Sequence, residues 1–122
     1  MWIHMPCRSF CLFPHLPPTQ VLDAMDYAVY VNDVEHIVLD NLQFMLGTSA
    51  GKGFERFDQQ ERALDLFRQF ATSKNVHITL VVHPRKEAEN SPLGISSVFG
   101  TAKATQEADN VIIVQSTTEV GG

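Results

Sequence analysis

The chain has 122 residues, of which 44% are hydrophobic, and its formal net charge is −5. This length suits one domain rather than two, and no apolar run is long enough to cross a membrane as a helix. The acidic balance argues against a protein that binds nucleic acid through its overall charge, although a local basic strip is compatible with it.

The first eighteen residues differ in composition from the rest of the chain. They lack the apolar core and cleavage site of a signal peptide and the arginine content of a transit peptide. Prolines break regular elements, so the sequence predicts a poorly ordered lead-in over residues 1–18, followed by a single domain over residues 19–122. The prolines of the lead-in are Pro6, Pro14, Pro17 and Pro18.

Both cysteines of the chain lie in this lead-in. His4, Cys7, Cys11 and His15 have the spacing H-x2-C-x3-C-x3-H, and all four are residue types that bind zinc. The C-x3-C core has no second knuckle, which is unusual for a zinc site. We expect two free thiols here and keep a zinc site as the alternative.

A helix followed by a strand is predicted next. Thr19 is a candidate N-cap, and the helix is expected to end near residues 32–33. Residues 36–40, HIVLD, form a short apolar run that is typical of a strand covered on both faces. One face of the predicted helix carries the apolar residues Val21, Leu22, Met25, Ala28 and Val29.

The segment GTSAGKG, residues 47–53, is rich in glycine and is predicted to be a loop. A phosphate-binding loop has the pattern G-x4-G-K-[ST], because its amides must surround phosphates and its hydroxyl must reach Mg²⁺. Here only three residues separate Gly47 from Gly51, and Gly53 replaces the hydroxyl. We therefore expect a flexible connector, with phosphate binding as the alternative.

Two further pairs of a helix and a strand follow. Residues 54–75 are predicted to be a helix that buries Phe57, Leu64, Phe67 and residues 70–71, with Asn75 as its cap. Residues 76–83 are predicted to be a second buried strand, which Pro84 ends. After a polar loop come a short helix near residues 98–109 and a third apolar strand at 110–116. Strands that alternate with helices predict an α/β fold with a parallel sheet.

Polar residues follow the ends of these strands, where parallel sheets form their sites. Asp40 and Asn41 end the first strand, His83 ends the second, and the basic residues Arg85 and Lys86 come next. A carboxylate at a strand tip suits Mg²⁺, which takes one or two carboxylates and leaves its other positions to water and phosphates. The alternatives are an ordinary turn residue for Asp40, a strand-end residue for His83 and solvated loop charges for the two cations.

The segments HIVLDNLQFM, HITLVVHPRKE and SSVFGTAKATQEADNVIIVQ together resemble the C-terminal helicase domain of mitochondrial replicative DNA helicases. These enzymes belong to the hexameric DnaB-like and phage primase-helicase group. The resemblance runs from about Val21 to Gln115. It implies an incomplete RecA-like parallel sheet with flanking helices, which is a P-loop NTPase core lacking its Walker-A unit.

The resemblance also implies roles for single residues. Asp40 corresponds to the Walker-B acid that holds Mg²⁺, and Asn41 lies beside it at the ATP site. His83 corresponds to the histidine that senses the γ-phosphate, and Gln106 to the glutamine that links the nucleotide site to DNA. Three cations correspond to a surface for single-stranded DNA, namely Arg85, Lys86 and Lys103.

The sequence also departs from that family. It contains no Walker-A pattern, and we expect no arginine finger, so the chain is expected to be inactive alone as part of an ATP-dependent helicase. The family implies other helicase subunits as partners, in a hexameric or heptameric ring, and the mitochondrial matrix and its nucleoids as the location. The alternative is a non-catalytic RecA-like interaction module that associates with full-length subunits. A small flavodoxin-like or response-regulator domain is a third interpretation.

Overall fold

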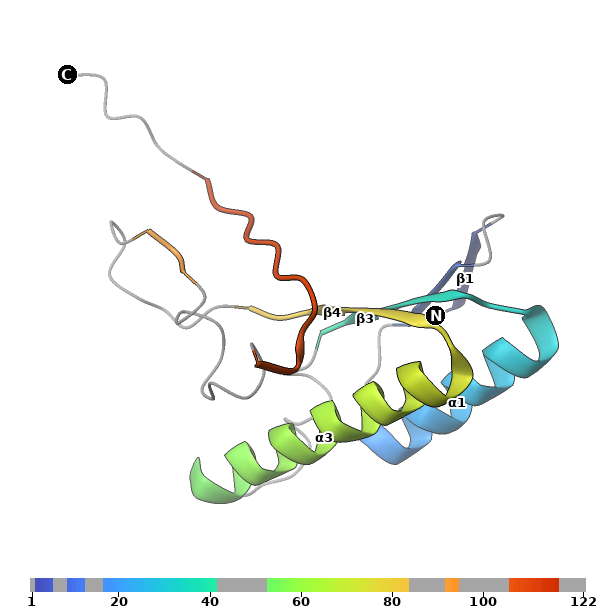
Figure 1. Cartoon of the computed structure of the whole chain (residues 1–122), viewed down its shortest axis with the longest axis horizontal. Coiled ribbons are helices and arrows are strands. Elements are labelled where there is room, and N and C mark those ends of the chain that lie inside the picture. Colours follow the sequence, from blue (N-terminus) through green and yellow to red (C-terminus); the bar gives the residue numbers. More distant parts are fainter. Residues whose placement is uncertain are drawn as a thin grey trace.

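A computed structural model describes residues 2–5, 9–12, 17–41, 53–83, 92–94 and 106–116 (Figure 1). The side chains of residues 2–5, 9–12 and 53–57 are outside this description. The elements in chain order are β1 (Trp2–Met5), β2 (Ser9–Leu12), α1 (Pro18–Asn32), β3 (His36–Asp40), α3 (Gly53–Lys74) and β4 (His77–Val81).

The four strands form one sheet in the order β1-β2-β3-β4. Strands β2, β3 and β4 run parallel, and β1 pairs with β2 in the antiparallel direction. The predicted α/β fold with helices between parallel strands is therefore confirmed, and the antiparallel edge strand β1 is an addition to it. Helix α1 connects β2 to β3, and helix α3 lies between β3 and β4.

The expectation that prolines exclude regular structure from residues 1–18 is wrong. Two segments of this region are strands, and the prolines fall between them or after them, at residues 6, 14 and 17. Proline cannot donate to a sheet ladder, so it limits the length of these strands without preventing them. β2 also satisfies the backbone of β3, because residues 9–12 pair with residues 36–39. The boundary between residues 18 and 19 stays a prediction.

The N-cap of helix α1 lies two residues before the predicted position, at Pro17 instead of Thr19. Pro18 is its first residue, and Pro17 at the N-cap makes no side-chain hydrogen bond. Thr19 therefore lies inside the first turn, and its predicted role as the N-cap is wrong. Proline suits this position because the first helical amide needs no partner within the helix. The predicted end is confirmed, since Asp33 follows in the left-handed conformation with φ of 50°.

Helix α3 ends as predicted. Its last residue is Lys74, and Asn75 has a positive φ of 53°, a conformation that asparagine adopts more readily than most residues. The helix begins at Gly53, so the glycine-rich segment contributes its last residue to α3. Residues 47–52 lie outside the described part of the chain.

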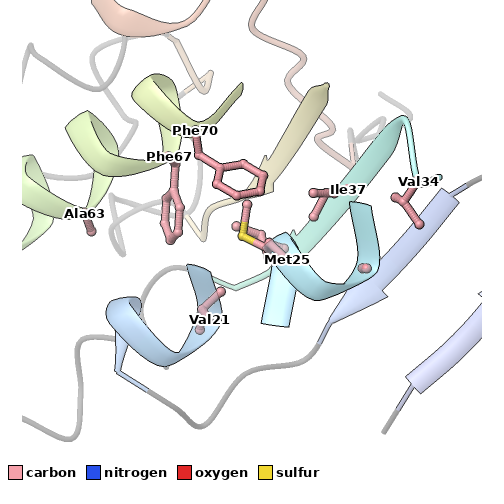
Figure 2. Close-up of a cluster of buried hydrophobic side chains, with 9 residues drawn as sticks. Val21, Met25, Val34, Ile37, Ala63, Phe67 and Phe70 are labelled. Carbon is pink, nitrogen blue, oxygen red and sulfur yellow. The ribbon is translucent and has the colours of Figure 1, made fainter. Parts of the chain in front are cut away.

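The core lies on one face of the sheet, between β3 and the two helices (Figure 2). Figure 1 shows α1 and α3 side by side beneath the strands. An ion pair of 2.9 Å between Lys74 Nζ and Asp26 Oδ1 also joins the two helices. The buried hydrophobic residues are Val21, Met25, Ala28, Val34, Ile37, Leu39, Ala63, Phe67 and Phe70. The predicted apolar faces of both helices are thus confirmed, apart from Phe57, whose side chain is outside the description.

The prediction that the strands are covered on both faces is wrong. In β3, Ile37 and Leu39 are buried, whereas His36, Val38 and Asp40 on the other face are half-buried. In β4, His77 and Thr79 are exposed and the other residues are half-buried. Within the described residues both helices cover the same face, so the opposite face of these two strands remains accessible.

The predicted third apolar strand at residues 110–116 is also wrong. These residues belong to neither a helix nor a strand, and Ile112 and Val114 are 87% and 88% exposed. An apolar sequence becomes a strand only when a neighbour completes its hydrogen-bond ladder, and β4 ends the sheet in the described part of the chain. Most of the predicted helix at 98–109 lies outside the described residues; Gln106 and Glu107 within it are helical.

In the described ranges, no helix combines the length and hydropathy that a membrane span needs.

Candidate functional site at the carboxyl ends of β3 and β4

The carboxyl ends of β3 and β4 bring Asp40 and the His83 segment to the same edge of the sheet. The strands are parallel neighbours, and Asp40 is the Cα partner of Val81. His83 follows Val81 by two residues and is exposed. The sequence-based expectation that both residues lie on one edge is therefore confirmed, whereas their functional roles stay predictions.

Asp40 is half-buried and lies on the sheet face that the helices do not cover. The alternation of β3 determines this orientation, because Ile37 and Leu39 point into the core and the residues between them point away. A hard divalent cation needs an accessible oxygen ligand of this kind. The half-buried position of Asp40 is thus compatible with a role as a Mg²⁺ ligand.

Asn41 differs from its neighbour, since it is only 6% exposed. It is the first residue after β3, and it is buried, as are the core residues of that strand. The side chain has little surface to offer to a nucleotide, and as a buried amide it needs partners from the protein. We therefore expect Asn41 to support the end of β3 rather than contact the cofactor.

Gln106 is exposed, and the residue after it is attached to α3. Arg68 Nη1 lies 3.0 Å from Glu107 Oε2, and the same nitrogen donates a hydrogen bond to the backbone carbonyl oxygen of Glu107. This double contact joins the Gln106 segment to the helix between the two site strands. Local sequence patterns do not predict this contact, because Arg68 and Glu107 are 39 residues apart in the chain.

The remaining predicted site residues lie outside the described part of the chain. They are the cations Arg85, Lys86 and Lys103. For the zinc alternative, Cys7 and His15 are outside the description, as are the side chains of His4 and Cys11. Among the described residues, no group of three or more histidine, cysteine, aspartate or glutamate side chains could hold a metal ion.

A cluster at the opposite edge was missed by sequence reasoning. His36 and His77 are Cα partners at the amino ends of β3 and β4, and their ring centroids are 4.6 Å apart. His36 Nε2 also lies 2.8 Å from Thr79 Oγ1. The sequence does contain a signal for this pairing, since HIVLD and HITLV share the pattern H-I-x-L, and the two patterns are in register in the sheet.

Comparison with protein families agrees with this geometry. The family model described as AAA domain matches residues 8–89, which include β2, α1, β3, α3 and β4. This range contains both site strands as well as Asp40 and His83. It covers about two thirds of the chain, and it starts within residues 1–18, the predicted lead-in. The chain therefore belongs to the AAA domain family, whose members are nucleotide-binding proteins of the P-loop NTPase type.

Proposed function

We propose that this chain is part of an ATP-dependent replicative DNA helicase of the Twinkle type, which unwinds DNA in the 5′-to-3′ direction during mitochondrial DNA replication. The observation that carries the proposal is the pairing of parallel strands that brings Asp40 and His83 to adjacent strand ends. Membership of the AAA domain family supports nucleotide chemistry at this edge. The motifs HIVLDNLQFM and HITLVVHPRKE support the helicase assignment.

The chemistry of the described residues fits the metal side of a Mg²⁺–ATP site. Asp40 would hold Mg²⁺, and the exposed ring of His83 would donate a hydrogen bond to a phosphate oxygen. When bound, Mg²⁺–ATP supplies the phosphoryl group and neutralises part of its charge. Asn41 would keep the end of β3 in place beneath Asp40.

The sequence contains no Walker-A pattern that would surround the phosphates of ATP. Triphosphates owe most of their affinity to backbone amides and a lysine that surround them, and G-x4-G-K-[ST] does not occur in the chain. We therefore expect weak nucleotide binding and no ATP hydrolysis by the chain alone. Full activity would require a phosphate-binding loop from other parts of the helicase ring.

Single-stranded DNA would bind next to this edge. Arg85 and Lys86 follow His83 directly, so two cations lie close in sequence to the proposed phosphate sensor. Contacts of this kind to the DNA backbone are independent of base sequence and weaken with salt. Lys103 would add a third cation, and Gln106 would connect the DNA surface to α3 through the Arg68–Glu107 contact.

Paramagnetic broadening by Mn²⁺, used in place of Mg²⁺, tests the proposal on the chain alone. In the presence of ATP, we expect the backbone amide signals of Asp40, Asn41 and His83 to broaden first. Asp40→Asn should abolish this selectivity. Asp23→Asn, which removes one charge from the exposed side of α1, should preserve it. Broadening that is uniform over all acidic residues, or unchanged in Asp40→Asn, would refute the proposed metal site.

A non-catalytic interaction module is the second candidate function. The exposed apolar residues Ile112 and Val114 favour it, because side chains of this kind are usually covered by a partner. In this case the chain would bind full-length helicase subunits in the mitochondrial matrix, and binding would not depend on Asp40. Light scattering after co-elution with such a subunit, with wild-type and Asp40→Asn chains, separates the two functions. The module is supported if the chain associates with the full-length subunit and Asp40→Asn has no effect on ATP turnover by the complex.

A further inference from the structure

The amino ends of β3 and β4 hold two imidazoles in direct contact. His36 and His77 are Cα partners in the parallel ladder. Their ring centroids are 4.6 Å apart with an interplanar angle of 88°, so the edge of one ring meets the face of the other. The backbones of the two segments are also hydrogen-bonded at this point, because the His77 amide donates a hydrogen bond of 2.8 Å to the Glu35 carbonyl oxygen.

Thr79 forms a hydrogen bond with the His36 ring that is compatible with both protonation states of the ring. Its hydroxyl oxygen lies 2.8 Å from His36 Nε2. A hydroxyl can donate to a neutral ring nitrogen and can accept from a protonated one, so this hydrogen bond serves both forms. Any preference for the neutral ring must therefore come from burial and from neighbouring charges.

Within the part of the chain that the structure describes, the charged groups near the pair are of both signs. On β3, Glu35 precedes His36, and on β2 the Cα partner of His36 is Ser9, which does not titrate. Lys74, at the end of α3, lies three residues before His77, and its charge is paired with Asp26 of α1. The titratable residue of β2, Cys11, is in register with Val38 rather than with His36. Both helices lie on the opposite face, against Ile37 and Leu39.

Burial and the neighbouring His77 both lower the pKa of His36 below the ordinary imidazole value of about 6.5. Protonation of both rings would place two like charges across one strand pair, which is unfavourable. Two protons on the pair thus oppose the pairing of β3 with β4.

We propose that His36 and His77 form a proton-sensitive lock on the β3–β4 pair, which accepts one positive charge and opens at its amino end when both rings are charged. The same two strands carry Asp40 and His83 at their other end. The lock therefore makes the geometry of the candidate site dependent on pH through these two strands.

The direction of the pH effect follows from the lowered pKa of His36. The folded chain binds fewer protons than the unfolded chain at pH values between the folded and unfolded pKa. The contribution of His36 to stability is therefore fully present above about pH 6.5 and decreases as the pH falls below this value. The decrease ends when His36 is protonated in the folded state as well.

NMR titration of the histidine rings in the full chain tests the lock. We expect the His36 midpoint to lie below 6.5 and to rise in His77→Gln. The rise is expected because the substitution removes the coulombic effect of His77 that lowers the His36 pKa. His83→Gln is the matched control, because it removes an exposed histidine from the opposite edge, and it should leave the His36 midpoint unchanged.

Thermal unfolding provides the second readout. The Tm of the wild-type chain and of His83→Gln should fall between pH 7 and pH 5.5, and His77→Gln should reduce this fall. An unchanged His36 midpoint in His77→Gln, or an equal fall of Tm in all three chains, would overturn the proposal. If His77→Gln does not fold, the wild-type titration still decides, because a His36 midpoint at or above about 6.5 would contradict the proposal.

Discussion

The packing of β3 predicts a large loss of stability in Ile37→Ala. The Ile37 side chain is fully buried among residues of α1 and α3 (Figure 2). Truncation to alanine removes three carbon atoms, worth about 2.4 kcal/mol at 0.8 kcal/mol for each buried methylene. The cavity left behind adds to this, so we expect a total loss of about 3–4 kcal/mol, within the range of measured isoleucine-to-alanine substitutions.

The matched control for this substitution is Val38→Ala, because Val38 is the next residue of the same strand and lies half-buried on the other face. We expect it to lower the free energy of unfolding by about 1 kcal/mol or less. Urea denaturation followed by circular dichroism at the helix band measures both variants. Equal losses, or a loss below about 1 kcal/mol for Ile37→Ala, would refute the one-sided burial of β3.

Two other predictions concern local contacts. Asp33 has a left-handed conformation with φ of 50°, so Asp33→Ala should lower the stability by about 1 kcal/mol whereas Asp33→Gly should cost little. Comparison of the two Tm values checks this, and equal values would contradict it. For Arg68 and Glu107, whose side chains are 51% and 30% exposed, a double-mutant cycle with alanine should give a coupling of about 0.2–1 kcal/mol that decreases at high salt. A coupling of zero at low salt would show that this ion pair does not hold the Gln106 segment.

The fold class and several helix ends could be predicted because they depend on local patterns. The spacing of Val21, Met25 and Ala28 places one apolar face on α1, and this face is buried. Asn75 marks the end of α3 because its side chain tolerates a positive φ. Asp40 and His83 could be assigned to one edge because parallel strands end at the same side of a sheet.

The errors concern features that depend on a neighbour. Residues 9–12 carry a weak strand signal between prolines, and they become a strand because β3 accepts them as a partner. The segment at 110–116 has a much stronger strand signal, and it remains without a ladder in the described structure. Strand formation requires hydrogen bonds from another segment, so propensity alone decided neither case.

Sequence by itself determined which residues of this protein are apolar, where the two helices end, and which polar residues follow the strands. Tertiary structure alone decided which faces are covered and which distant side chains meet. Contacts such as those between His36 and His77, 41 residues apart, or between Arg68 and Glu107, depend on strand register and helix placement. Register is a property of two segments together, since a shift of one residue turns every side chain to the other face.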